Sequence, residues 1–147
     1  MSIPVAMTKS AASGKASVFT SSQTNTLSLD TLGFDHASID VIFGPAASTS
    51  SVAQTLTLKQ GDTSVGATEN VTGFTGDLKP AIYAGQTVAT QMTITRLEVD
   101  CRGKKRWLAV AASPNTDTVI VISARLSRGE EGPYDATTKG VSVNVAG

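Results

Sequence analysis

The chain is a succession of short segments in which apolar and polar residues alternate. The clearest segment is 37–43, where Ala37, Ile39, Val41 and Phe43 share one parity. Because successive side chains of a strand point to opposite faces, this pattern predicts a strand with one buried face. Similar alternation or short apolar runs predict further strands over residues 16–20, 26–30, 54–60, 91–100, 106–112, 118–124 and 141–145.

Three of these regions carry additional information. In residues 91–100 the apolar parity changes near Arg96, which predicts a β-bulge. Residues 118–124 are apolar on both faces, which favours a central place in a sheet. Residues 65–85 are glycine-rich, so we expect one or two short strands and a long loop there.

No segment has a sustained helical period, and turn residues recur about every ten positions. About eight strands with this spacing predict an all-β fold, a jelly roll or a related β-sandwich of antiparallel strands. The strand count does not separate a jelly roll from an immunoglobulin-like sandwich. Residues 1–15 are small, polar and aperiodic, which predicts a flexible N-terminal arm before a single domain over residues 16–147.

Charge and cysteine content narrow the function classes. Charged residues make up 16% of the chain, and twelve basic residues balance twelve acidic ones. A dedicated nucleic-acid-binding protein normally carries a surplus of Lys and Arg, so nucleic acid is not the expected partner. A net charge of zero leaves little repulsion between copies, which permits self-association. The single cysteine, Cys101, excludes an intrachain disulfide.

The sequence predicts neither a membrane-spanning segment nor a secretion signal. No run approaches the roughly 18 apolar residues of a membrane span. Residues 3–7 are too short and too interrupted for the core of a signal peptide. We therefore expect synthesis and folding in a cytoplasm, with no membrane partner.

Residues that could support catalysis are few. His36 is the only histidine and lies beside Asp35, but no Gly-x-Ser-x-Gly nucleophile motif accompanies it. Cys101 lies next to a basic segment whose cations would lower its pKa, although a small buried side chain is the simpler interpretation. One Cys and one His do not supply a zinc ligand set. We expect a non-enzymatic protein without metal or cofactor.

The densest charge feature is a basic turn formed by Arg102, Lys104, Lys105 and Arg106, which leads into Trp107. Three interpretations apply: a solvated hairpin turn, a patch that docks on an acidic protein surface, or a phosphate contact with base stacking. Trp107 is expected to be a core or interface anchor first. With Tyr83 and Tyr134 it would alternatively line a sugar-binding platform.

The order of three motifs resembles a known family. Residues 30–41 form a Gly-Phe turn that leads into a strand, residues 55–62 a strand that ends in a polar turn, and residues 103–110 a basic turn that opens a strand. Together with residues 124–128 and 132–134, they resemble the small capsid cement, or decoration, proteins of tailed bacteriophages.

This resemblance implies a jelly-roll or related β-sandwich that forms homo-dimers or homo-trimers and bridges major capsid protein subunits. It also implies synthesis in a bacterial cytoplasm and a final place on the outer surface of the virion. The alternative is a carbohydrate-binding head or tail fibre component. The candidate partner-binding residues lie in the arm, the basic turn and a late loop: Ser2, Ile3, Val5, Lys9, Lys15, Arg102, Lys104, Lys105, Arg106, Trp107, Glu130 and Tyr134.

Overall fold

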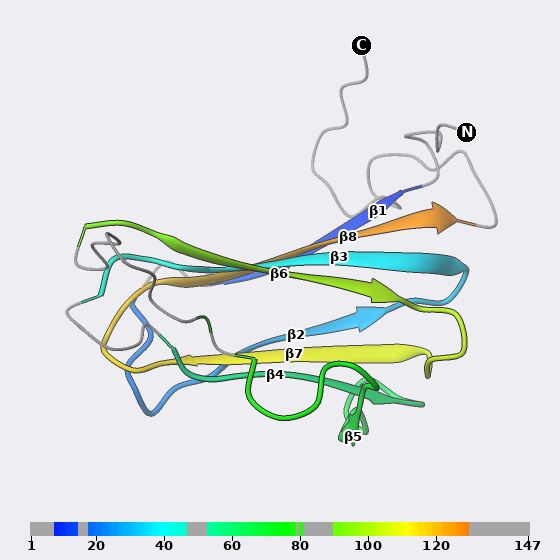
Figure 1. Ribbon diagram of the computed structural model, residues 1–147, viewed down its shortest axis with the longest axis horizontal. Helices are drawn as coiled ribbons and strands as arrows, with labels where there is room; N and C mark the ends of the chain where they lie inside the picture. The colour runs from blue at the N-terminus through cyan, green and yellow to red at the C-terminus, as the bar shows by residue number, and fades with distance from the viewer. Residues whose placement is uncertain (1–7, 15–17, 47–52, 79, 81–89, 130–147) are drawn as a thin grey trace, which may run out of the picture.

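Two antiparallel sheets packed face to face make up the computed structural model, which describes residues 8–14, 18–46, 53–78, 80 and 90–129 (Figure 1). Within these residues there are eight strands and no helix. The strands are β1 (Lys9–Ser13), β2 (Asn25–Asp30), β3 (Phe34–Phe43), β4 (Ala53–Gly61), β5 (Glu69–Asn70), β6 (Thr93–Asp100), β7 (Trp107–Pro114) and β8 (Ile120–Gly129). The predicted all-β sandwich is therefore confirmed.

The strand order identifies the sandwich as a jelly roll. One sheet has the order β1-β8-β3-β6 and the other has the order β2-β7-β4-β5. The pairs β1 with β8, β2 with β7, β3 with β6 and β4 with β5 are nested like the two arms of one long hairpin. Rolling up that hairpin adds the β3–β8 and β4–β7 pairs. Eight strands in this arrangement define the jelly roll, which an immunoglobulin-like order does not match.

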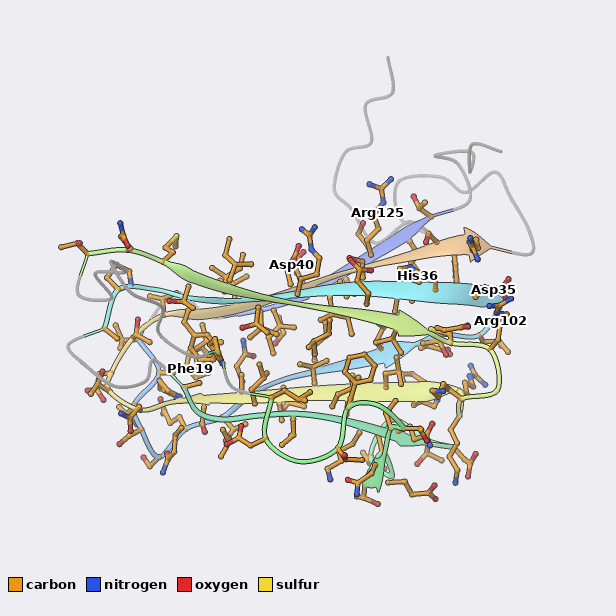
Figure 2. All side chains as sticks on the ribbon, in the orientation of Figure 1. Phe19, Asp35, His36, Asp40, Arg102 and Arg125 are labelled. Carbon is orange, nitrogen blue, oxygen red and sulfur yellow. The ribbon has the colours of Figure 1, made fainter. Side chains whose placement is uncertain are left out.

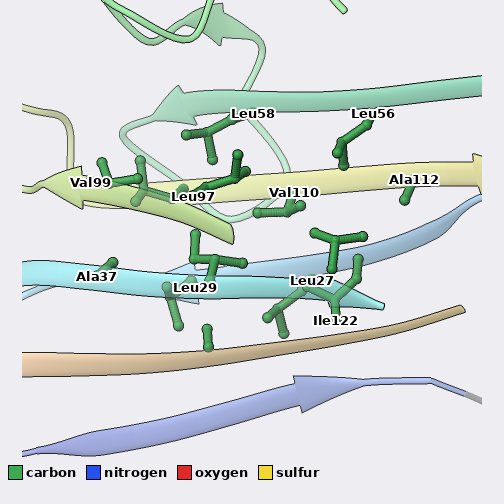
Figure 3. Close-up of a cluster of buried hydrophobic side chains, with 14 of the residues drawn as sticks. Leu27, Leu29, Ala37, Leu56, Leu58, Leu97, Val99, Val110, Ala112 and Ile122 are labelled. Carbon is green, nitrogen blue, oxygen red and sulfur yellow. The ribbon is translucent and has the colours of Figure 1, made fainter. Parts of the chain in front are cut away.

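The core lies between the sheets, where the inward faces of both meet (Figure 3). In β3, Ala37, Ile39, Val41 and Phe43 are all fully buried, as the alternation predicts. Side chains of the facing sheet, such as Leu29, pack into the same cluster. Each large apolar side chain removed from water contributes about 1.5–3 kcal/mol, so this shared layer is the main source of stability.

The N-terminal segment differs from its expected form. Lys9–Ser13, inside the predicted flexible arm, forms β1 and pairs with β8 from Lys9 opposite Leu126 to Ser13 opposite Ile122. The segment has no large apolar residue, so its alternation is invisible in the sequence. The expected strand at residues 16–20 is represented by a single bridge between Phe19 and Thr118, and residues 15–17 lie outside the described residues.

The predicted bulge near Arg96 is wrong. The register of β6 with β3 is continuous from Thr93 opposite Phe43 to Asp100 opposite His36. The parity change arises because Ile94 points outward and is 61% exposed, while the polar Thr93 takes the buried position. A register irregularity occurs elsewhere, between Ala53 and Thr55 of β4.

The other strands follow the sequence with two changes. β7 extends through the expected turn to Pro114, opposite the irregular end of β4, a place that tolerates proline. β8 lies centrally between β1 and β3, as expected. Only its inward face is buried, because Val121 is half-buried and Ser123 is exposed on the outer face. The expected strand at residues 141–145 lies outside the described residues.

Candidate functional site

The basic turn between β6 and β7 is held by ion pairs within the protein. Arg106 donates two hydrogen bonds to Asp30, from Nε at 2.9 Å and from Nη2 at 2.7 Å. Arg102 makes a similar two-bond pair with Asp100, at 3.0 and 2.7 Å. These bonds favour the charged carboxylates, so the guanidinium groups of Arg106 and Arg102 lower the pKa of Asp30 and Asp100, respectively.

Lys105 is also engaged. Its Nζ donates to Glu69 of β5 and to Asp62, the latter at 3.0 Å. The hydrogen bonds to Glu69 and then to Asp62 raise the pKa of the Lys105 ammonium. Lys104 makes no ion pair within the described part of the chain. Three of the four cations are therefore already neutralised, so an acidic partner must compete with internal carboxylates for them.

Trp107 lies on the outer face of its sheet rather than in the core. Its neighbour Leu108 points inward and is fully buried, whereas Trp107 is half-buried. The guanidinium carbon of Arg106 lies 5.7 Å from the centroid of the indole ring, which is a cation–π distance. The interpretation of Trp107 as a core anchor is wrong. Its role as an interface anchor stays a prediction, and Tyr83 and Tyr134 lie outside the described residues.

His36 connects two neighbouring strands on the outer face of the β1-β8-β3-β6 sheet. Oγ of Ser127 lies 3.4 Å from Nδ1 of His36, and Nε2 of His36 lies 3.2 Å from Oε2 of Glu98. In a catalytic triad the acid holds Nδ1 and the nucleophile contacts Nε2, which is the opposite arrangement. We interpret the three side chains as a cross-strand polar network, extended by a 2.9 Å bond from Ser38 to Glu98.

A pocket of about 380 Å³ opens beside this network, at the end of the sandwich where Figure 2 labels Asp35 and Arg102. Its lining is polar and carries both signs of charge: Asp35, His36, Asp100, Arg102, Ser127 and Arg128. Arg128 has a backbone φ of 57°, a left-handed conformation that a non-glycine residue rarely adopts. Asp100 and Arg102 are committed to each other, so their charges largely compensate within the pocket lining.

Cys101 is buried directly after β6, which confirms its interpretation as a small buried side chain, whereas the alternative of a lowered pKa is wrong. Burial is the main cause that raises the pKa of its thiol to about 11, and the Asp100 and Asp35 charges act in the same direction. Its Sγ contacts the carbonyl oxygen of Val99 at 3.8 Å. A neutral thiol in this position is a poor nucleophile.

An apolar patch on the outer face of the β1-β8-β3-β6 sheet was not found from the sequence. The register places Ile42 of β3 opposite both Ile94 of β6 and Val121 of β8. Met92 is 61% exposed next to this row, and Val119 is 37% exposed. We call these five residues the outer apolar patch. One signal of the patch was present in the sequence. Ile94 and Leu97 have opposite parity, so in a regular strand one of these apolar side chains must point outward, although we interpreted the change of parity as a bulge.

Gly44 contributes to the accessibility of this patch. Its backbone N–H donates to the carbonyl of Val119 at 2.8 Å. A Cβ built at Gly44 would lie 3.5 Å from Cβ of Val119 and 3.0 Å from the hydroxyl of Thr118. The absence of a side chain therefore leaves one flank of Val119 uncovered.

Several predicted partner-binding residues are not brought together by the described structure. Lys9 lies in β1, near enough to Asp30 for its charge to act on that carboxylate after the larger influence of Arg106. The remaining candidates lie outside the described residues and stay predictions: Ser2, Ile3, Val5, Lys15, Glu130 and Tyr134.

The fold and these surfaces define a jelly-roll protein with an apolar patch on one sheet and a charge-compensated turn at one end. Comparisons with models of protein families, with curated proteins and with solved structures find no match to this chain. Among the described residues, no helix has the length and apolarity needed to cross a bilayer, and no cluster of three potential metal ligands occurs.

Proposed function

We propose that this protein is a non-enzymatic cement protein of a tailed bacteriophage head, which binds and bridges major capsid protein subunits on the outer surface of the shell. The proposal combines the motif resemblance with the jelly-roll order, an architecture that capsid proteins and lectins use as a rigid block. The partner is the major capsid protein, and many weak contacts act together because many copies bind one shell.

The observation that carries the proposal is the outer apolar patch. Ile94, on the outer face of the sheet, and Met92, directly before β6, are each 61% exposed. Exposed side chains on such a face are ordinarily polar. The register brings Ile42, Ile94 and Val121 side by side across three strands. Contiguous exposed apolar side chains bordered by polar ones are typical of protein-binding surfaces.

The surroundings of the patch suit a protein partner. Next to the Ile42–Ile94 row, Arg96 donates to Asp40 at 2.7 and 3.0 Å. Figure 2 shows Asp40 and Arg125 directed away from the second sheet, on the outer side of the sandwich. An apolar centre bordered by paired charges matches the core and rim of a protein interface.

Binding to heads that lack the protein tests the proposal. The double variant Met92→Asp, Val119→Asp should weaken binding at least about tenfold, because a buried unpaired carboxylate is costly at an interface. The matched control is Val65→Asp, since Val65 is 93% exposed on a turn after β4. Equal binding by the patch variant and the control would overturn the docking role of the patch. No saturable binding by the unmodified protein would overturn the proposed function.

A further inference from the structure

Among the described residues, the β6 strand lies at one edge of its sheet. Within the described residues β6 pairs only with β3. The N–H of Cys101 donates to the carbonyl of Asp35 at 2.8 Å, so Asp100 and His36 form a non-hydrogen-bonded pair. The backbone groups of Asp100, and of every second residue before it, therefore point away from β3. These residues are Ile94, Arg96, Glu98 and Asp100.

No other edge of the described sandwich offers as long a ladder. β5 has two residues, and β1 has five. The β1 and β2 edges are tied to each other, because Ser13 donates to Oδ1 of Asn25 at 2.6 Å and to the carbonyl of Thr26 at 3.1 Å. β6 has eight residues in continuous register. It has no proline and no bulge, two features that normally protect the edge of a sheet from pairing with another chain.

From this geometry we infer that β6 pairs with β6 of a second copy in an antiparallel, two-fold symmetric arrangement centred on Leu97. Opposite residues of an antiparallel pair point to the same face of the sheet. The two-fold axis must therefore pass between one residue and the same residue of the second copy. Centring on Leu97 places Arg96 opposite the partner's Glu98, and the symmetric contact repeats it. The β1-β8-β3-β6 sheets of the two copies then join into one continuous sheet.

Charge selects this register over its neighbours. Centring on Arg96 places that cation opposite its own copy, and centring on Glu98 places two carboxylates opposite each other, both of which are destabilising. The Leu97 register also extends an existing row. Asp40 pairs with Arg96 in one copy, and the partner's Glu98 continues the alternation of sign.

The backbone geometry agrees with the same register. Arg96 and Glu98 both direct their backbone groups to the open edge, so they form a hydrogen-bonded pair that exchanges two N–H···O bonds. Ile94 and the partner's Asp100 form the next such pair. Asp100 keeps its two bonds to Arg102 there, so its carboxylate is not left unpaired beside Ile94.

The inference deepens the proposed function, on which its biological role rests, by naming a second copy of the chain as a partner. Its test needs no capsid. Light scattering of the full chain over a series of concentrations should give twice the 15.1 kDa mass of one chain. A monomer at all concentrations would overturn the inference, whereas loss of capsid binding by an intact dimer would overturn only the proposed function.

Two charge-reversal variants test the register. Arg96→Glu places two carboxylates opposite each other at each contact, and Glu98→Arg places two cations there, so each variant alone should raise the dimer dissociation constant at least about tenfold. In an equimolar mixture of the two variants, a heterodimer places a carboxylate opposite a cation at both contacts. The mixture should therefore recover the dimer mass. This recovery also shows that both variants are folded.

The matched control is Arg125→Glu, an exposed residue on the same outer face but on the central strand β8. It should leave the dimer mass unchanged. Dimers that persist in both single variants, or a mixture that stays monomeric, would contradict pairing of β6 in this register.

Discussion

Asp30 and Arg106, 76 positions apart in the sequence, are joined by two hydrogen bonds that connect the end of β2 to the residue before β7. The carbonyl of Arg106 also accepts from the N–H of Thr31 at 2.9 Å and from its hydroxyl at 2.7 Å. The turn predicted to bind a partner is therefore first a structural connection between neighbouring strands.

The first prediction concerns the pH dependence of this pair. The hydrogen bond from Arg106 holds the pKa of Asp30 below its value in the unfolded chain. The stabilisation is present above the unfolded value and is lost as the pH falls through the lower folded value. Urea unfolding should show that Asp30→Asn lowers the midpoint at neutral pH. As the pH falls through the lowered folded pKa, its midpoint should approach that of the unmodified protein, and a difference that persists undiminished in acid would contradict this assignment.

The second prediction concerns the core. Leu58 of β4 is 1% exposed among the inward side chains, and Leu58→Ala should destabilise the protein by about 2–5 kcal/mol because it removes buried apolar atoms and leaves a cavity. Leu32→Ala is the control, since Leu32 is 66% exposed and its replacement should change stability by less than about 0.5 kcal/mol. Chemical denaturation measures both, and equal losses would argue against the described core.

The third prediction concerns Gly61 at the end of β4. A Cβ built there would lie 2.3 Å from the carbonyl oxygen of Gly66 and 2.5 Å from Cα of Ala67, both backbone atoms of the following turn. Gly61→Ala should therefore destabilise the fold by about 1–3 kcal/mol. Gly14→Ala meets only ordinary contacts at 3.6 Å and is the matched control. A thermal midpoint unchanged in the Gly61 variant would show that the turn does not close on β4.

The fourth prediction concerns the thiol of Cys101. Burial raises its pKa to about 11, so the folded protein should react slowly with a thiol reagent at pH 8 and rapidly in denaturant. Above pH 9 the unfolded thiol ionises first, so this group's contribution to stability should fall as the pH rises towards 11. Fast labelling of the native protein at pH 8 would contradict the buried position.

The fifth prediction concerns the polar network around His36. Ser127 contacts Nδ1 of His36 and Glu98 contacts Nε2, which is the reverse of a catalytic triad. Ser127→Ala should therefore leave any background hydrolysis of an activated ester unchanged. A burst of product release that disappears in this variant would instead identify Ser127 as a nucleophile.

Strand positions were predictable where large apolar residues alternate, as in β3, because burial on one face writes a period of two into the sequence. β1 was missed because Lys9–Ser13 is small and polar, and its place depends on pairing with β8, more than a hundred residues away. Strand order was likewise not predictable, since it depends on pairing between distant segments.

The charged turn shows the corresponding limit for the site. The sequence displays Arg102, Lys105 and Arg106 as one cluster, but the partners of Lys105 and Arg106, which are Asp30, Asp62 and Glu69, are distant along the chain. Only the fold brings them together and neutralises the cluster. The outer apolar patch was hidden for the same reason, because its members come from β3, β6, β8 and the residues beside them.

The most direct test of the central claim is the number of copies of this chain per major capsid subunit in purified phage heads, combined with surface labelling of the intact particle. A structural cement should be present in a fixed ratio to the capsid protein and accessible to the label from outside. Absence from heads, or only trace copies inside them, would contradict the account.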